Sequence, residues 1–550
     1  MGRVQSVVAR ANRKLTVQFA AALIAGSTMA SMLFGFLRER LLNGYYYDTY
    51  PVGLDAYTAA FILPDFMYFI LVSGALSVTF IPVFNQRLAS GNKKSAWELS
   101  TSMVNLMALA TLVASVLIII FAEPLIRYVI APGLSESGTA LAVSMMRVIA
   151  VNPFLFAIAT VIASIQQALG RFTFYALAPT IYNIGIIIGI VFFTNGINLF
   201  GWQVFEGGIM GVALGVVLGS IMQLVVSSAG LIGLGFDYRF KIYWRNKGFR
   251  RVLALLPARS LDQGMDYLVG IVETNLASRM AAGTVRAYNQ AMTLQMAPIN
   301  LIGVAISTAA FPKMTERLSE GKLDLFRQEL RSVLRVIIWL SLPVAIVTFF
   351  TRGYLVNFIK SGGDLLMAQL LGVLVVAILF RSVYYIAARS FYAQQDTKTP
   401  LYISLFAIGF NILLAIWFTA GLNMGPFGLA LAQSIMAGVE VVILFIVMSM
   451  RIPGLLNGAF WNAVWRMASA TGFMAIVSYI MVLFLPLQAG DDSSFYFTFP
   501  KFVLIVTVSL GSYIMFSRLL KLHEVEPVIR QYGKLTNAFR RMKTGGNSKR

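Results

Sequence analysis

The sequence predicts an all-α polytopic membrane protein with about fourteen transmembrane helices, arranged as two parallel six-helix repeats followed by two further helices. The first observation is composition: 58% of the 550 residues are hydrophobic and only 12% are charged, far beyond what a soluble core needs. The second is a series of apolar runs of about 20 residues, the length that crosses roughly 30 Å of hydrocarbon. The third is an internal duplication, in which motifs recur after about 230 residues.

The apolar runs give the predicted spans in chain order. Their centres lie near Ile24, Tyr68, Leu112, Phe156, Ile186, Val217, Leu268, Val304, Leu340, Val375, Leu405, Ile435, Ile476 and Val508. The first run is predicted to be a span and not a cleaved signal peptide. It continues into Arg38 and lacks a small-residue cleavage site.

Two separate sets of residues carry the duplication. The first set is Gly74, Ala75, Leu76, Ser77, Pro82, Arg87, Leu88 and Gly91, matched by Gly303, Val304, Ala305, Ile306, Pro312, Arg317, Leu318 and Gly321. The second set is Gln166, Gln167 and Asn183, matched by Gln394, Gln395 and Asn411. A membrane protein built from two related halves usually places its substrate path where the repeats meet, so the duplication predicts a transporter.

The repeat also predicts the domain organisation. The predicted parts are an N-terminal lobe of six spans (1–237), a basic cytoplasmic linker (238–252), a second lobe of six spans (253–450), two additional spans (451–522) and a basic cytoplasmic tail (523–550). Because six is an even number, the two lobes share one orientation in the membrane. The two additional spans have no counterpart in the first half and are predicted to form a lipid-facing support or a docking surface.

The distribution of basic residues sets the predicted orientation. Lys and Arg concentrate in alternate loops, around Arg87, from Arg239 to Arg251 and from Lys313 to Arg331. This bias places these loops and both termini in the cytoplasm of a bacterial cell, with the spans in its cytoplasmic membrane. The net charge of +21 does not indicate nucleic-acid binding, because the cations are scattered through short loops. It suits contact with anionic membrane lipids.

The chain offers few groups for catalysis. It contains no cysteine, and its one histidine, His523, follows the last predicted span. The sequence shows neither a phosphate-binding loop nor a nucleophile elbow. We therefore expect a transporter and not an enzyme, without cofactor or metal, and driven by the membrane potential or by a monovalent cation.

Charged residues within the predicted spans are the candidates for function, because each is costly in hydrocarbon unless it faces a cavity or a partner. Arg38, Glu39, Asp55 and Asp65 form the first set. Arginine suits a diphosphate, since the guanidinium fork binds phosphate oxygens in pairs, while Glu39 and Asp65 are predicted to act in gating or coupling. The alternative is that Arg38 and Arg40 lie at the membrane interface with their charged groups in water.

The second set of candidates surrounds the seventh predicted span. It consists of Asp262, Asp266, Glu273, Arg279 and Arg286. Asp262 and Asp266 are four residues apart, so they share one helical face and could take up a cation or a proton. Glu273 could instead pair with Arg279 or with another neighbour. The three carboxylates are therefore predicted gating or coupling groups.

The chain resembles the MurJ (MviN) family in motifs that follow one another through nearly its whole length. In the N-terminal half these are Ser31, Gly35-Phe36-Leu37-Arg38-Glu39, Asp55-Ala56-Tyr57, Ala60-Phe61, Leu63-Pro64-Asp65, Gly74-Ala75-Leu76-Ser77, Phe80-Ile81-Pro82-Val83, Gly170-Arg171-Phe172, Ala178-Pro179-Thr180 and Asn183. In the C-terminal half they are Leu276-Ala277-Ser278, Gly283, Phe391-Tyr392 and Gln395-Asp396-Thr397-Lys398-Thr399-Pro400. Members of this family are lipid II flippases, within the superfamily of multidrug, oligosaccharidyl-lipid and polysaccharide exporters.

The resemblance implies fourteen spans, two six-helix lobes and a central cationic cavity, with the last two helices forming a groove for the lipid tail. It also implies that Arg38, Gly35, Ser31 and Asp55 occupy positions that the family uses at the cavity and its gate. Glu39 stands where the family usually has an aspartate.

Three positions depart from the family pattern. Met32, Tyr68 and Thr293 stand where the resemblance implies arginines, so three cavity cations are missing. Arg279 and Arg286 are the candidates for replacement charge, and spacing alone does not show whether they reach the cavity. The departures bear on the substrate more than on the fold.

The resemblance therefore implies a flippase that moves lipid II, an undecaprenyl-diphosphate-linked peptidoglycan precursor, to the outer leaflet by alternating access. Lipid II and membrane lipids are the expected partners, with cell-wall synthesis or division proteins as further candidates. The alternatives are an exporter of another polyprenyl-linked glycolipid, a multidrug or cation exporter of the same superfamily, and a non-transporting scaffold for wall synthesis.

Overall fold

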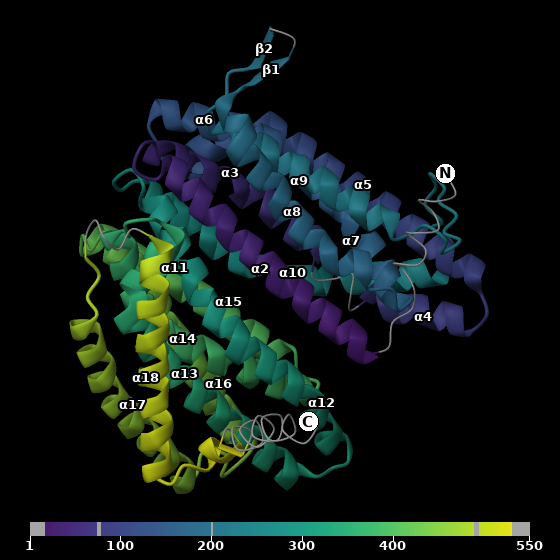
Figure 1. Ribbon diagram of the computed structural model, residues 1–550. Helices are drawn as coiled ribbons and strands as arrows, with labels where there is room; N and C mark the ends of the chain where they lie inside the picture. Colours follow the sequence, from purple (N-terminus) through teal and green to yellow (C-terminus); the bar gives the residue numbers. More distant parts are fainter. Residues whose placement is uncertain (1–16, 74–78, 200–201, 489–493, 528, 531–550) are drawn as a thin grey trace, which may run out of the picture. The chain divides into compact units, whose positions relative to one another are not determined.

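The computed structural model describes residues 17–73, 79–199, 202–488, 494–527 and 529–530, and these are almost entirely helical (Figure 1). By its internal contacts the chain divides into two compact units, Met1–Ala287 and Tyr288–Arg550. Both chain ends, the motif that begins at Gly74, and the side chains of the candidates Asp262 and Asp266 lie outside the described residues.

The first unit consists of helices joined by short turns and one hairpin. Its helices are α2 (Val17–Tyr46), α3 (Pro51–Tyr68), α4 (Ile81–Ala89), α5 (Lys93–Pro124), α6 (Glu136–Ile149), α7 (Asn152–Ala168), α8 (Thr173–Phe192), α9 (Met210–Ala229) and α10 (Lys247–Ser278), with the π-helical turns η1 (Phe69–Ser73) and η3 (Leu125–Ile130) and the 3-10 turn η4 (Phe193–Asn195). An antiparallel hairpin, β1 (Ile197–Leu199) with β2 (Trp202–Phe205), connects α8 to α9. The all-α prediction is confirmed except for this hairpin, whose strands are too short to produce a distinct sequence pattern.

The second unit continues with helices only, in the part of the chain that the structure describes. Its elements are α11 (Thr284–Ile299), whose first turn still belongs to the first unit, η5 (Asn300–Val304), α12 (Ala305–Ser319), α13 (Leu323–Ile359), α14 (Leu365–Ala393), α15 (Lys398–Ile416), η6 (Trp417–Gly421), α16 (Pro426–Arg451), α17 (Gly458–Phe484), α18 (Phe495–Leu519) and η8 (His523–Val525). Each of the predicted span centres falls in one of these helical segments or in a helix of the first unit.

Twelve helical segments among the described residues are long and apolar enough to cross a membrane. Two other helices, α2 and α10, contain 30 and 32 residues but are not among these twelve. Both carry charged residues, which are Arg38, Glu39 and Arg40 in α2 and a basic first turn in α10. The structure thus confirms a polytopic membrane protein.

The described parts of the duplicated motif have similar structures in the two units. The π-helical turn η1 follows α3, and η5 follows α11. Further along, α4 and α12 each end at a glycine with positive φ, Gly91 at 75° and Gly321 at 71°. Each glycine donates its N–H to a leucine carbonyl at 3.0 Å, Gly91 to Leu88 and Gly321 to Leu318. This is the Schellman type of helix ending, which favours glycine in the left-handed position.

The second pair of matched sequences corresponds with a different offset. After α7, Gly170 adopts a φ of 71° and donates its N–H to the Gln167 carbonyl at 3.0 Å. After α14, Gln395 adopts a φ of 59° and donates to the Tyr392 carbonyl at 3.0 Å. Gln395 is therefore equivalent to Gly170, an offset of 225 residues (395 minus 170), and its predicted match to Gln167 is wrong by three. Matching the two Gln-Gln pairs gave the wrong register, because this turn is defined by its hydrogen bonds and Gln395 occupies the position of Gly170.

Helices α8 and α9 approach so closely that only glycine fits between them. A Cβ atom added at Gly189 would lie 2.4 Å from the Cα of Gly215, and one added at Gly185 would lie 2.2 Å from the Cα of Gly219. Glycines spaced four residues apart lie on one face of a helix, and their lack of a side chain allows direct backbone contact. The sequence pattern of both helices therefore sets their spacing.

We expect that Gly189→Val separates α8 from α9 and lowers the stability of the protein by about 3 kcal/mol, because the side chain meets backbone that cannot move aside. The measurement is the thermal unfolding midpoint of the purified protein. The control is Gly409→Ala, since nothing lies within 4 Å of a Cβ atom added at Gly409. Equal midpoints for the two variants would contradict the packing argument.

Helix α10 packs within the first unit, although the sequence assigned it to the second lobe. Phe249 and Val252 are buried in a core formed with α4, α5 and α7. The ring of Tyr267 stacks on Phe69 of η1 with 4.6 Å between the ring centroids. By its internal contacts the first compact unit extends to Ala287. The predicted bounds of the lobes, which rest on the count of spans, stay a prediction.

The two additional predicted spans correspond to α17 and α18, which pack on each other and on α13. The indole of Trp339 in α13 donates to the Ser517 hydroxyl at 3.1 Å, and the Tyr513 hydroxyl donates to the Trp339 carbonyl at 2.9 Å. The first residues of the predicted tail also pack here, since Val525 is buried in the same core.

Candidate functional site

The last turns of α2 place polar side chains inside the first unit. Glu39 and Asn43 are four residues apart and therefore lie on one face of the helix. Arg38 donates from Nε and Nη2 to Glu39 Oε1, at 3.0 and 2.5 Å. Their side chains are only 24% and 16% exposed. Arg38 is thus an ion-paired and mostly buried side chain.

Arg286, in the first turn of α11, brings a second guanidinium to the same carboxylate. Its Nη2 donates to Glu39 Oε2 at 2.6 Å. Its Nε and Nη2 also donate to Asn43 Oδ1, at 3.1 and 2.9 Å. The Arg286 side chain is 4% exposed, so its charge depends on these partners. Glu39 therefore bridges two arginines that are 248 positions apart in the sequence (286 minus 38).

Asp55 in α3 fixes the backbone at the start of α11. Its two carboxylate oxygens accept hydrogen bonds from the N–H groups of Gly283, at 2.6 Å, and Arg286, at 2.8 Å. The first N–H groups of a helix have no partner within the helix, so a carboxylate is a favourable cap. Gly283 adopts a φ of 90°, a conformation that favours glycine. Asp55 thus positions Arg286 without contacting its side chain.

Asn183 in α8 holds Arg38 from the other side. Its Oδ1 accepts a hydrogen bond from Arg38 Nη1 at 3.1 Å, and its Nδ2 donates to the Ser31 carbonyl at 3.2 Å. The two helices lie side by side in Figure 1, and α2 packs against α8 in the structure. A Cβ atom added at Gly35 would lie 3.7 Å from the Asn183 amide, an ordinary contact. The predicted residues Ser31, Gly35 and Arg38 therefore line one contact with α8.

Asp65 and two tyrosines complete the surroundings of Arg38. Asp65 is half-buried in α3 and close enough to Arg38 for an electrostatic interaction. Tyr57 and Tyr182 also lie within electrostatic range of the guanidinium. Within the described part of the chain, the Asp65 carboxylate forms neither a hydrogen bond nor an ion pair, while its backbone carbonyl accepts from the Phe69 N–H.

The two guanidinium groups are chemically suited to an anionic ligand. Arg38 and Arg286 share one carboxylate, and guanidinium groups bind phosphate oxygens bidentately in the same geometry as carboxylate oxygens. A diphosphate could therefore replace Glu39 as their common partner. The described residues include no group of three or more histidine, cysteine or acidic side chains that could hold a metal ion.

The structure separates several predicted residues from this cluster. Arg279 is exposed at the end of α10, where its Nε donates to Asn275 Oδ1 at 3.1 Å. Glu273 is buried further back in α10, 5% exposed. Of the two candidates for replacement charge, Arg286 joins Arg38 and Arg279 does not.

The three departures from the family pattern place no charge near Arg38. Met32 is 58% exposed on α2. The Tyr68 hydroxyl shares a hydrogen bond with Thr160 Oγ1 at 2.9 Å, and its ring packs edge-on against Phe156. Thr293, in the second unit, donates to the Asn289 carbonyl of its own helix at 2.9 Å. Arg286 is therefore the cation that the structure adds to Arg38.

Two sets of polar contacts were not predicted from the sequence. Asn43 binds both Nε and Nη2 of Arg286, and its spacing of four from Glu39 was the available indication. In the second unit, Arg381 of α14 pairs with Glu440 of α16 at 3.4 Å, and Ser404 of α15 donates to the same carboxylate at 2.9 Å. Charged residues within apolar runs were again the indication.

Comparison with known proteins agrees with this architecture. The family model for "Lipid II flippase MurJ" matches residues 51–499. A probable lipid II flippase MurJ of Thermotoga maritima is 24% identical over 517 residues, which cover 92% of this chain and 97% of the relative. The lipid II flippase MurJ of Burkholderia cenocepacia is 26% identical over 399 residues, covering 70% and 74%.

Solved structures show the same fold. A lipid II flippase MurJ in an inward closed conformation matches with a TM-score of 0.72 at 22% identity, covering 90% of this chain and 98% of that structure. An inward-facing multidrug resistance transporter of the MATE family matches with a TM-score of 0.64 at 17% identity, covering 77% and 95%. Since the family model matches well over half of the sequence, the chain belongs to the lipid II flippase MurJ family.

Proposed function

We propose that this protein moves lipid II from the inner to the outer leaflet of the bacterial cytoplasmic membrane by alternating access. Membership of the family and the names of its relatives support this assignment. In this proposal α2 and α10 also cross the membrane, which gives fourteen spans with both termini in the cytoplasm. The protein is a transporter and not an enzyme, and it draws on the membrane potential or on a cation gradient.

The observation that carries the proposal is the sharing of Glu39 by Arg38 and Arg286. The two guanidinium groups share the two oxygens of one carboxylate in a mostly buried site, so both are paired through Glu39. The diphosphate of a polyprenyl-linked precursor supplies at least as much negative charge as Glu39, with more oxygens for the guanidinium forks. Binding of the diphosphate therefore exchanges one partner for another without exposing an unpaired arginine.

The same contacts close the outer end of the site in this proposal. With a cytoplasmic N-terminus, α2 runs outward, so its last turns, the start of α3 and the start of α11 all lie toward the outer surface. Glu39 and Asp55 tie α2 and α3 to the first turn of α11. Displacement of Glu39 by the substrate loosens this tie, and outward release of the headgroup follows.

The test is the leaflet exposure of lipid II in cells depleted of this protein, scored with an impermeant enzyme that cleaves only outward-facing molecules. We expect cleavage to fall and lipid II to accumulate inside, and a plasmid-borne copy to restore cleavage. Unchanged cleavage, in cells that have no second flippase, would overturn the assignment.

A second candidate substrate is another polyprenyl-diphosphate glycolipid. Met32, Tyr68 and Thr293 favour it, because the headgroup contacts that arginines at these positions would supply are missing. The same assay separates the two, since such an exporter leaves lipid II cleavage unchanged while its own glycolipid accumulates inside.

A further inference from the structure

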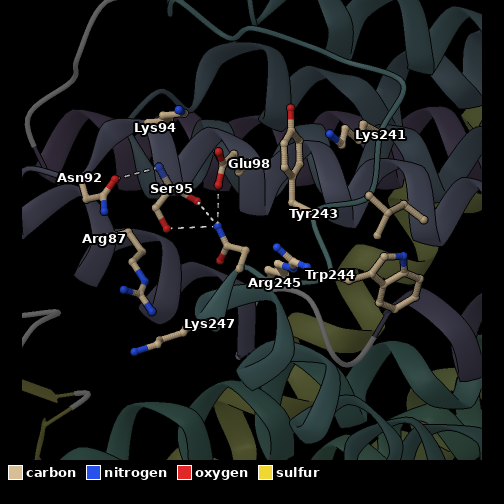
Figure 2. Close-up of a pocket in the computed structure, with 12 residues that line it drawn as sticks. Arg87, Asn92, Lys94, Ser95, Glu98, Lys241, Tyr243, Trp244, Arg245 and Lys247 are labelled. Carbon is tan, nitrogen blue, oxygen red and sulfur yellow. Dashed lines mark hydrogen bonds between the residues drawn. The ribbon is translucent and has the colours of Figure 1, made fainter.

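A basic pocket of about 780 Å³ lies in the first unit, away from Arg38, where the loop before α5 meets the segment before α10 (Figure 2). Its wall includes the cations Arg87, Lys94, Lys241, Arg245 and Lys247, with Glu98 as the only carboxylate. The volume is in the range of pockets that hold small ligands. Five cations against one carboxylate make this pocket strongly positive.

Among the residues that the structure describes, none of these five cations forms an ion pair with a carboxylate. Arg87 is the clearest case, because its Nε is buried and has no hydrogen-bond partner. Lys241 lies over the ring of Tyr243, 5.4 Å from the centroid. A buried guanidinium nitrogen without an acceptor indicates that an anionic group belongs in the pocket.

Hydrogen bonds hold the floor of the pocket in place. Asn246 accepts from the N–H groups of Gly248, at 2.9 Å, and Phe249, at 3.1 Å, and thereby caps α10. Its Nδ2 donates to the Ser95 carbonyl at 3.0 Å and to Glu98 at 3.3 Å. The start of α10 is therefore fastened to the first turns of α5, and both helices begin at the pocket with their positive ends.

The basic segment that was predicted to be a linker forms the wall of the pocket. The Asn105 amide of α5 donates to the carbonyls of Arg239, at 2.9 Å, and Lys241, at 3.0 Å. The Tyr243 N–H donates to the Ser102 hydroxyl at 2.8 Å. The polar residues of α5 at this end thus hold the segment against the helix, and the cations are presented by a fixed surface.

Exposed aromatic side chains lie beside the cations on the same segment. Phe240 is 93% exposed, Trp244 is 55% exposed, and Tyr238 is 49% exposed. Aromatic residues of this kind are enriched where proteins meet the interface of a membrane. A phospholipid has a group for each part of this surface. Its phosphate suits the cations, and its apolar body suits the aromatic rings.

We propose that this pocket binds the phosphate headgroup of an anionic phospholipid of the cytoplasmic leaflet. Arg87, Lys247 and Arg245 hold the phosphate, and Trp244 contacts the glycerol and upper acyl region. On the predicted topology the pocket lies on the cytoplasmic side, where anionic headgroups attract basic surfaces. The inference does not depend on which substrate the protein transports.

The experiment uses the purified full-length protein in phosphatidylcholine vesicles that contain increasing amounts of brominated phosphatidylglycerol. The readout is quenching of tryptophan fluorescence, with the contribution of Trp244 obtained by comparison with Trp244→Phe. We expect saturable quenching of Trp244. Inorganic phosphate, added as a competitor of the brominated lipid, tests whether a free anion suffices.

Two variants with equal loss of charge test the location of the site. The pocket variant carries Lys94→Gln, Arg245→Gln and Lys247→Gln, and the control variant carries Arg250→Gln, Arg251→Gln and Lys322→Gln. All three control positions are exposed and outside the pocket. We expect the pocket variant to lose on the order of tenfold more affinity than the control, beyond the diffuse attraction that both lose equally.

Each alternative outcome contradicts the proposal. Equal losses in the two variants would show diffuse attraction to the membrane surface, and protection of Trp244 by inorganic phosphate without preference for phosphatidylglycerol would show a site for a small anion. If the triple variant does not fold, Lys247→Glu replaces it. An acidic residue in the first turn of a helix is favourable for folding, and this variant should still weaken lipid binding.

Discussion

Replacing Arg38 with alanine is expected to lower lipid II transport on the order of 100-fold, because a guanidinium that binds two phosphate oxygens contributes at least one strong charge-assisted hydrogen bond. The folded protein should persist, since Glu39 keeps Arg286 as its partner. The measurement is cleavage of outward-facing lipid II in cells that depend on the variant, together with the thermal unfolding midpoint of the purified protein.

Arg40→Ala is the matched control, two residues further along the same helix. Arg38→Lys tests the fork, because lysine keeps the charge but offers no planar pair of donors, so we expect partial transport. Normal transport by Arg38→Ala would remove this residue from the site. Loss of the folded protein would instead show a structural role.

Replacing Asp55 with alanine should produce the largest loss of stability among the residues of the site. The N–H groups of Gly283 and Arg286 then lose their acceptor, and Asp55 is only 2% exposed, so water does not readily replace it. Leaving two buried donors without partners costs about 3 kcal/mol. The measurement is the thermal unfolding midpoint of the purified protein in detergent.

Asp48→Ala is the control for this experiment, since Asp48 is exposed in the turn between α2 and α3. A surface change of this kind alters stability by about 0.5 kcal/mol or less. Asp55→Asn retains one acceptor oxygen and should fall between the two. If Asp55→Ala melts at the same temperature as Asp48→Ala, the carboxylate does not fix the start of α11.

Most of the fold could be predicted because it follows from local properties of the sequence. Every predicted span centre lies in a helical segment. Gly91 and Gly321 end corresponding helices of the two units, since only a few residues fit the left-handed position that ends a helix. Two features could not be read in this way. The offset at Gly170 and Gln395 depends on hydrogen bonds that unlike residues can form equally well. The packing of α10 depends on contacts with helices far away in the sequence.

The site was predicted in part. Arg38, Glu39, Asp55 and Arg286 were identified singly, because charges are conspicuous in apolar segments. Their connection was not visible, since Glu39 and Arg286 are 247 positions apart and no periodicity links them. For the same reason the sequence could not separate Arg286 from Arg279. The roles of these residues in substrate binding stay predictions.

The glycine contact between α8 and α9 has a mechanical consequence. With backbone against backbone at Gly189 and Gly215, no rotamer change can absorb a sliding motion between the two helices. We therefore expect the two helices to move together as one rigid unit. The β1–β2 hairpin joins them at one end. Asn183 of α8 contacts Arg38. A displacement of the Arg38 guanidinium is therefore expected to rotate both helices and not α8 alone.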